Sequence, residues 1–338
     1  MTAVECAIVV ERLGDNHYRA HCPLFPDCEA VATTEAAARQ AVAESIERIL
    51  RDRQKKTFMN PIDLLFQRLR SQGRKAFIPF VTAGDPSLSA TSRLVEELAH
   101  RGASLIEIGF PYSDPIADGP VVQASYTRAL AQGIRLDNIF ACLRELAHSS
   151  PIKEQKLPLV AMISYTLVHR RGPEGFVSQA RAAGLSGIIV PDLPIEEADQ
   201  LTQLATAQEL KLIQMVTPTT PPERAKWIAR SATGFLYYVS VAGITGERDQ
   251  LPQQLLSQLG WLRGQTELPI CVGFGISKPA HVEMLRDVVD GVIVGSALVR
   301  RLEQAGTRPL ADLIHEIGDL AQSLADALNP GGISVPTV

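Results

Sequence analysis

The sequence has few cysteines, and their spacing excludes several classes of protein. Its 338 residues include five cysteines, an odd number, and no two of them form a Cys-x-x-Cys pair. Such a pattern argues against a disulfide framework and against a zinc site, both of which need paired or clustered cysteines. We therefore expect the cysteines to be small buried side chains, and we expect no metal.

The chain also lacks a strong charge of one sign and a long apolar run. Its net charge of −4 offers no general attraction to nucleic acid or to anionic membranes. No apolar run approaches the ~20 residues that span a bilayer, and no basic flank precedes an apolar stretch at the N-terminus. The composition is 46% hydrophobic and 21% charged, which is typical of a globular protein. A cytoplasmic protein without nucleic-acid or membrane partners is expected.

Residues 1–56 predict a small β-β-β-α domain that ends in a charged linker. The three predicted strands are residues 4–10, 17–22 and 29–33. Gly14-Asp15-Asn16 predicts the first turn, and the proline-containing run 23–28 predicts a rigid loop. From Thr34, a candidate N-cap, apolar residues at helical spacing predict an amphipathic helix. The charged run 51–56 is either a solvated linker or the tail of that helix.

This first unit is similar to HicB-like antitoxin domains, which carry a His-Cys-Pro…Pro-x-Cys loop and a helix rich in Ala and Glu. The matching loop here begins at His21-Cys22-Pro23 and ends at Pro26-Asp27-Cys28. Residues 1–56 hold eight basic and nine acidic residues, so no basic nucleic-acid surface is evident. A binding or regulatory module and an inert appendage both remain open.

A second unit, residues 57–338, begins with Met59-Asn60-Pro61. Asn60 is a candidate N-cap, and Pro61 suits the first helical position. Because a new helical pattern starts here, an alternative translation start at Met59 remains open.

Short apolar runs then alternate with helix-length amphipathic stretches. The runs predict eight strands, at residues 77–81, 105–108, 159–163, 187–190, 212–216, 235–239, 270–272 and 291–294. This alternation is typical of a (β/α)₈ (TIM) barrel, whose active site lies on the loops after the strands. Periodicity alone would also allow a doubly wound sheet.

The most informative run is Leu105 to Pro120, Leu-Ile-Glu-Ile-Gly-Phe-Pro-Tyr-Ser-Asp-Pro-Ile-Ala-Asp-Gly-Pro. Glu107 lies within a buried strand, where a carboxyl group is costly unless it is paired or protonated. Asp118 ends the polar loop that follows. Two carboxylates at one strand end suggest acid–base catalysis, although a satisfied core acid and a turn aspartate would give the same spacing.

Glycines after the last two strands indicate a phosphate site. Gly275 follows the seventh predicted strand, and Gly295 and Ser296 follow the eighth. Loops seven and eight are where barrels commonly bind phosphate through backbone N–H groups and a helix N-terminus.

The Leu105–Pro120 run resembles the tryptophan synthase alpha family, whose pattern is Glu-x-Gly-x-Pro-[Phe/Tyr]-Ser-Asp-Pro-x-Ala-Asp-Gly-Pro, and the similarity extends from about Pro61 to about Ala327. The resemblance implies a TIM barrel that cleaves indole-3-glycerol phosphate to indole and glyceraldehyde 3-phosphate. It implies that Glu107 transfers protons and that Asp118 stabilises charge on the ring nitrogen. No metal or organic cofactor is implied.

The same resemblance assigns further contacts. Tyr237 matches the family's active-site tyrosine, and Gly243-Ile244-Thr245-Gly246 resembles the mobile loop that closes over substrate. Thr245 and Gly246 would therefore bind substrate, and Gly246 would also bind its phosphate. Phe80 and Phe274 would offer flat apolar surface to the indole ring.

The implied partner is a beta subunit in an α₂β₂ tetramer, which would carry pyridoxal phosphate and join indole to serine. Ser164 and Thr166 depart from the family's Tyr-x-Asn pattern near the beta-subunit contact, which makes the partner coupling less certain than the chemistry. A stand-alone lyase and a regulatory protein that acts through its N-terminal module are the alternatives. Intact Glu107, Asp118, Gly275 and Ser296 argue against the second of these.

Overall fold

The computed structural model describes residues 8–14, 16–23, 25–57, 59–115, 118–240, 254–273 and 275–331. Two compact units divide the chain, residues 1–59 and residues 60–338.

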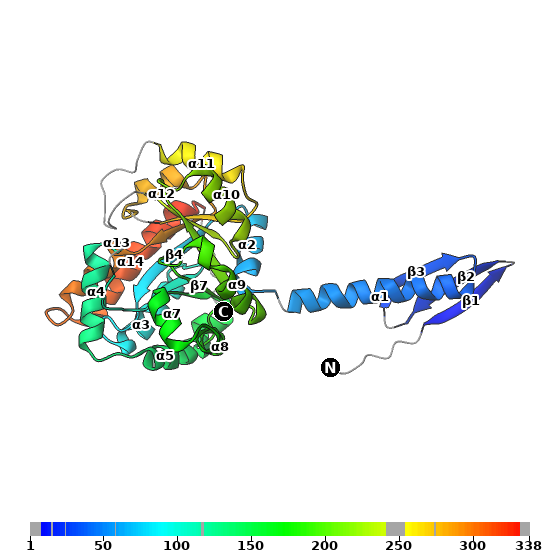
Figure 1. Ribbon diagram of the computed structural model, residues 1–338, viewed down its shortest axis with the longest axis horizontal. Helices are drawn as coiled ribbons and strands as arrows, with labels where there is room; N and C mark the ends of the chain where they lie inside the picture. The colour runs from blue at the N-terminus through cyan, green and yellow to red at the C-terminus, as the bar shows by residue number, and fades with distance from the viewer. Residues whose placement is uncertain are drawn as a thin grey trace. The chain divides into compact units, whose positions relative to one another are not determined.

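The N-terminal unit is an antiparallel sheet with one helix on its face (Figure 1). Its strands, in the order β1-β2-β3, are β1 (Val9–Gly14), β2 (His17–Cys22) and β3 (Phe25–Ala32), and its helix is α1 (Glu35–Thr57). Small and aliphatic side chains from the sheet and the helix form the core, namely Ala20, Cys22, Cys28, Ala38, Val42 and Ile46. Thr34 Oγ1 accepts a hydrogen bond from the Ala37 N–H at 3.2 Å, as its predicted capping role requires.

Two predicted elements of this unit were placed wrongly. The third strand begins at Phe25, within the predicted loop, because the connection from β2 is so short that Phe25 pairs directly with Cys22. Pro26 is tolerated there because it lies in the register shift between the Phe25 and Glu29 pairs, and prolines within sheets occur at edges and bulges. The first strand starts at Val9 and continues through the polar residues to Gly14, because pairing with β2 holds them in register. Residues 4–7 lie outside the described residues, and the run 51–56 is helical.

The second unit is a closed barrel of eight parallel strands within the described residues, which confirms the predicted fold. The strands are β4 (Ala76–Thr82), β5 (Ile106–Gly109), β6 (Leu159–Met162), β7 (Gly187–Ile189), β8 (Lys211–Val216), β9 (Leu236–Val239), β10 (Ile270–Gly273) and β11 (Gly291–Val294). They pair in chain order, and β11 closes the circle on β4. Each lies within two residues of its predicted bounds.

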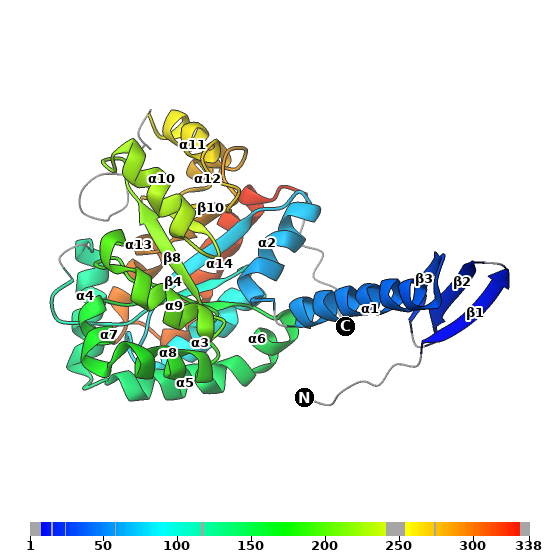
Figure 2. The ribbon, with the colours of Figure 1, turned by 45° about the vertical axis from the view of Figure 1, so that its right-hand side comes forward.

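Helices surround the barrel in both views (Figures 1 and 2). They are α2 (Pro61–Ser71), α3 (Leu88–His100), α4 (Pro120–Ala131), α5 (Leu136–His148), α6 (Ser150–Gln155), α7 (Tyr165–Arg171), α8 (Pro173–Ala182), α9 (Asp199–Ala207), α10 (Pro222–Ser231), α11 (Leu255–Arg263), α12 (Pro279–Leu285), α13 (Ser296–Val299) and α14 (Leu310–Leu328). Single 3₁₀ turns occupy Ile195–Glu197 and Arg300–Gln304. Among the described helices, none combines the length and the apolar character that crossing a bilayer requires.

Strand alternation creates two apolar layers. Outward side chains such as Ile106 and Ile108 pack under the helices, whereas inward ones such as Ile78, Val160 and Phe235 fill the barrel. Helix α2 adds four apolar side chains, Ile62, Leu65, Phe66 and Leu69, to the inner layer.

The start of α2 is anchored by Asn60. Its Oδ1 accepts from the Ile62 N–H at 2.8 Å, while its Nδ2 donates to the carbonyl oxygens of Ser186, at 2.8 Å, and Glu209, at 2.7 Å. These carbonyls precede β7 and β8, so α2 is fixed at the N-terminal end of the barrel. The loops that follow the strands lie at the opposite, C-terminal end of the barrel.

Candidate active site

Strand β5 carries Glu107 into the barrel because its apolar neighbours take the other face. Ile106 and Ile108 belong to the outer layer and Leu105 to the inner one, so the period of two directs Glu107 inward. Glu107 pairs in register with Phe80 on β4 and with Val160 on β6. The side chain is only 1% exposed. A carboxyl group is thereby held at the centre of the barrel, toward the end where the strands finish.

Burial governs the protonation of Glu107. Loss of solvation, and secondarily the charge of Asp118, raise its pKa to about 8. No described residue lies within hydrogen-bond distance of its Oε2 atom. Glu107 is therefore largely protonated at neutral pH and can donate a proton.

Asp118 lies in the loop after β5, one residue before the N-cap glycine of α4. The side chain of Gln123 holds this loop by donating to the carbonyl oxygens of Asp118, at 2.7 Å, and Pro115, at 3.1 Å. Asp118 is 7% exposed, and burial raises its pKa to about 6. A long hydrogen bond from the Tyr112 hydroxyl group, at 3.5 Å, lowers this pKa, whereas the charge of Asp192 raises it further. The two candidate carboxyl groups therefore titrate at different pH values, which suits different roles.

Two aromatic residues, Phe80 and Tyr237, belong to the same inner layer as Glu107. Each ring has room in its position because a neighbouring strand ends in glycine. A Cβ on Gly109 would lie 2.4 Å from Cζ of Phe80, and a Cβ on Gly273 would lie 2.3 Å from Oη of Tyr237. Glycine at these strand ends thus leaves room for the two rings. Burial raises the pKa of Tyr237 well above its usual range, and the charges of Glu107 and Asp118 add to the rise. Tyr237 is therefore close enough to both carboxyl groups for their charges to act on it.

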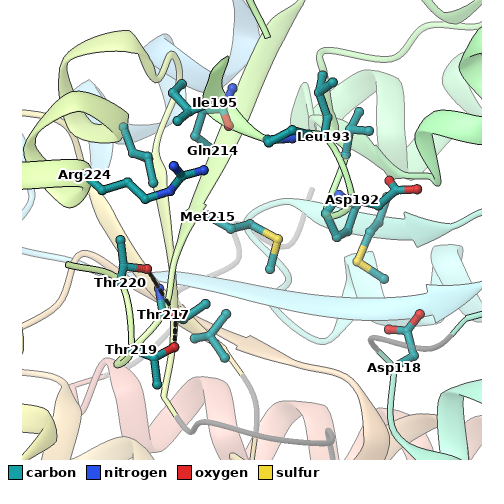
Figure 3. A pocket seen from close by; sticks show the side chains of 16 residues that line it. Asp118, Asp192, Leu193, Ile195, Gln214, Met215, Thr217, Thr219, Thr220 and Arg224 are labelled. Carbon is teal, nitrogen blue, oxygen red and sulfur yellow. Dashed lines mark hydrogen bonds between the residues drawn. The ribbon is translucent and has the colours of Figure 1, made fainter. Parts of the chain in front are cut away.

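A cavity of about 700 Å³ lies at the carboxyl ends of strands β6 to β9, and Asp118 forms part of its wall (Figure 3). The other lining residues are Met162, Val190, Pro191, Asp192, Leu193, Pro194, Ile195, Gln214, Met215, Thr217, Thr219, Thr220, Arg224, Ile228 and Val239. In Figure 3 the two aspartates lie toward the right of the cavity and Arg224 toward the left. Arg224 forms a two-pronged ion pair with Glu196. The volume is in the range of small-molecule sites.

The glycines assigned to phosphate lie on neighbouring loops. Gly275 follows β10, with a φ of +79°, and Gly295 follows β11 and precedes the first turn of α13, where Ser296 stands. Strands β10 and β11 are adjacent, so the two loops emerge side by side. None of these three residues lines the described cavity. Thr245, Gly246 and Phe274 lie outside the described residues.

Sequence reasoning missed several residues at this end of the barrel. Asp192 accepts hydrogen bonds from Ser164 Oγ at 2.6 Å and from the Tyr165 N–H at 2.8 Å, and so joins the loops after β6 and β7. Its position between two prolines directly after a predicted strand was a usable signal. Tyr112 lies in the same loop as Asp118, six residues away, and its place in the quoted run was a signal. Gln214 and Arg224 gave no such signal, because only the closed barrel brings them to the cavity. Within the described ranges, no cluster of three His, Cys, Asp or Glu side chains could hold a metal.

Comparisons with known proteins agree with this geometry. The family model described as "Tryptophan synthase alpha chain" matches residues 66–328. The tryptophan synthase alpha chain of Rhodopirellula baltica is 48% identical over 278 residues, covering 80% of this chain and 99% of the relative. That of Microcystis aeruginosa is 43% identical over 271 residues, covering 80% and 100%. The crystal structure of tryptophan synthase subunit alpha from Legionella pneumophila str. Paris is 34% identical, with a TM-score of 0.72 and coverage of 80% and 98%.

Proposed function

Since the chain belongs to the tryptophan synthase alpha chain family, we propose that Glu107 and Asp118 carry out its reaction. That reaction is the cleavage of indole-3-glycerol phosphate to indole and glyceraldehyde 3-phosphate, so the protein is a carbon–carbon lyase. The observation that carries our assignment is a carboxyl group buried inside the barrel, where loss of solvation raises its pKa, and a second carboxyl group at the cavity wall.

The reaction requires a proton donor because the carbon–carbon bond cannot break while the ring is aromatic. Protonation of indole C3 lets the ring nitrogen accept the bonding electrons. Glu107 would supply that proton. It would then accept the proton of the hydroxyl group on the glycerol chain of the substrate, next to indole C3. The pKa of about 8 supports this role, since the acid is protonated at neutral pH yet weak enough to become a useful base.

Asp118 would stabilise the positive charge that develops on the ring nitrogen. An anion helps most when it is held in a poorly solvated site before the charge appears. Asp118 is 7% exposed and its pKa of about 6 leaves it mostly ionised above neutral pH. The rings of Phe80 and Tyr237 would lie against the indole, as would Phe274, while Thr245 and Gly246 would close over the substrate.

We assign the phosphate group to Gly246, Gly275, Gly295 and Ser296. A Gly275→Ala substitution places a side chain at a φ of +79°, which ordinary residues rarely adopt. We expect the KM for indole-3-glycerol phosphate to rise about tenfold while kcat changes less, because lost anion contacts are present in both the bound and the transition state. Steady-state assays should compare it with Gly260→Ala, on an open face of α11. An equal loss of affinity for indole, which has no phosphate, would contradict the assignment.

We further propose that a beta subunit receives the indole in an α₂β₂ complex. The tryptophan synthase α₂β₂ complex of Pyrococcus furiosus has a matching chain that is 35% identical, with a TM-score of 0.68 and coverage of 74% of this chain and 98% of its own. Ser164, which stands where the family usually has tyrosine, is hydrogen-bonded to Asp192. This hydrogen bond fixes the loop after β6, which holds both Ser164 and Thr166. A fixed loop supports a preserved contact surface for the beta subunit, although these two residues depart from the family pattern.

The direct test is to incubate the purified protein with indole-3-glycerol phosphate and to measure indole, with and without a beta subunit. Indole release that the beta subunit accelerates supports the complete proposal. Full activity that the beta subunit leaves unchanged would favour a stand-alone lyase, and no indole under either condition would refute the lyase assignment.

Residues 1–59 lie outside the family match, and we propose that they form a separate unit, similar to HicB-like domains, that the lyase reaction does not need. A chain that begins at Met59 should fold, cleave substrate with kcat within about twofold of the full chain and still respond to the beta subunit, since the second unit has its own apolar core. Circular dichroism and the indole assay provide the measurement. An insoluble or inactive product would show that the first unit is needed by the barrel.

A further inference from the structure

Tyr126, on α4, is the largest fully buried side chain in the described chain, at 1% exposure. Its Oη atom has no hydrogen-bond partner among the described residues. A buried hydroxyl group without a partner is unfavourable, and most such groups in folded proteins are satisfied. Phenylalanine would fill the same space without that cost, so the hydroxyl group requires an explanation.

The Tyr126 hydroxyl group lies against the strand that carries Glu107. A Cβ placed on Gly109 would be 2.9 Å from Tyr126 Oη. Gly109 and Glu107 are two residues apart on β5, so they face the same way, and their Cβ positions are separated by about 7 Å. A glutamate side chain extends its oxygens about halfway across such a gap, toward Oη. Neither Glu107 Oε2 nor Tyr126 Oη has a hydrogen-bond partner among the described residues in the present arrangement, so a bond between them requires the carboxyl group to turn toward Oη.

The two groups complement each other. Oε2 of Glu107 is an acceptor without a donor, and Oη of Tyr126 is a donor without an acceptor. The rings of Tyr112 and Tyr126 are neighbours, with centroids 5.6 Å apart. The hydroxyl group of Tyr112, however, donates to Asp118. The titratable groups that surround the pair are Asp118 and Tyr112 on the loop after β5, Tyr237 on β9 and, acting through Asp118, Asp192.

We propose that Tyr126 is a positioning residue for Glu107: its hydroxyl group donates a hydrogen bond to the Glu107 carboxylate while that carboxylate is ionised. This inference rests on the proposed role of Glu107. The proton of Glu107 passes to indole C3, the resulting carboxylate accepts the hydrogen bond, and the proton of the substrate hydroxyl group then returns to Glu107. Tyr126 keeps its own proton throughout and does not touch the substrate.

The test is Tyr126→Phe, which removes only the hydroxyl oxygen. We expect kcat for indole release to fall about tenfold, which is the size of one hydrogen bond to a charged group, with KM nearly unchanged. The limb of the pH–rate profile that belongs to Glu107 should move to higher pH, because the ionised form loses a donor. The unfolding midpoint should stay or rise, since an unsatisfied buried group is gone.

Tyr238→Phe is the matched control. Tyr238 is next to Tyr237 on β9 but faces outward, and its hydroxyl group donates to Gln258 Oε1 at 2.6 Å. This variant should keep the wild-type kcat and pH profile. A wild-type rate and profile for Tyr126→Phe would overturn the inference, as would equal losses in both variants without a pH shift.

Glu107→Gln separates this inference from the proposed function. If Glu107→Gln remains fully active, the role of Glu107 is wrong and the inference falls with it. If Glu107→Gln is inactive while Tyr126→Phe behaves like wild type, only the role of Tyr126 is wrong. When both hold, adding Tyr126→Phe to Glu107→Gln should lower the residual rate no further.

Discussion

Replacing Glu107 by Gln should lower kcat for indole release by about two to four orders of magnitude, which is the usual contribution of a positioned acid–base group. The amide has nearly the same shape but can neither deliver nor accept the proton. Steady-state indole assays and circular dichroism would measure the loss and confirm that the fold persists. Glu209→Gln, which alters a surface pair with Arg181 ahead of β8, should leave kcat unchanged. Activity within a few-fold of wild type for Glu107→Gln would refute the assignment.

The same substitution should change how stability depends on pH. The folded-state pKa of Glu107, about 8, lies above its ordinary value of 4.5, so the folded protein binds more protons than the unfolded chain between these values. The free energy of unfolding of the wild type therefore falls as pH rises from 5 to 8, by about 3 kcal/mol from this group. Glu107→Gln should lack that contribution. Urea titrations at both pH values would reveal the difference.

Asp118→Asn should reduce kcat by about two to three orders of magnitude, as the loss of a preorganised electrostatic contact typically does. The effect on KM should be smaller, because the charge on the ring nitrogen develops only along the reaction. The wild-type rate should rise with pH through about 6, where Asp118 ionises, and the variant should lose that limb. Single-turnover and steady-state kinetics would separate binding from chemistry. A raised KM with normal turnover would instead make Asp118 a contact to bound substrate.

The sequence predicted the parts of this molecule that follow from local pattern. Apolar runs of strand length located all eight barrel strands, and a carboxylate inside one of them identified Glu107 as a candidate. Strand pairing could not be predicted as well. Strand β3 starts at Phe25 because Phe25 pairs with Cys22 of β2, and the sequence of one segment does not show its pairing partner. The proximity of Tyr126 to Gly109 on β5 is likewise visible only in the folded chain, and in the sequence Tyr126 looks like an ordinary core residue.

The anchoring of Asn60 has a consequence for how the molecule loses order. Two of its hydrogen bonds tie the first residue of the second unit to the segments before β7 and β8, far along the chain, and the third caps α2. The first turn of α2 is capped by Asn60 itself, whose position the barrel carbonyls fix, so the start of α2 does not depend on the residues before it. We therefore expect fraying along α1 to end before Asn60 and the second unit to unfold as a cooperative unit of its own.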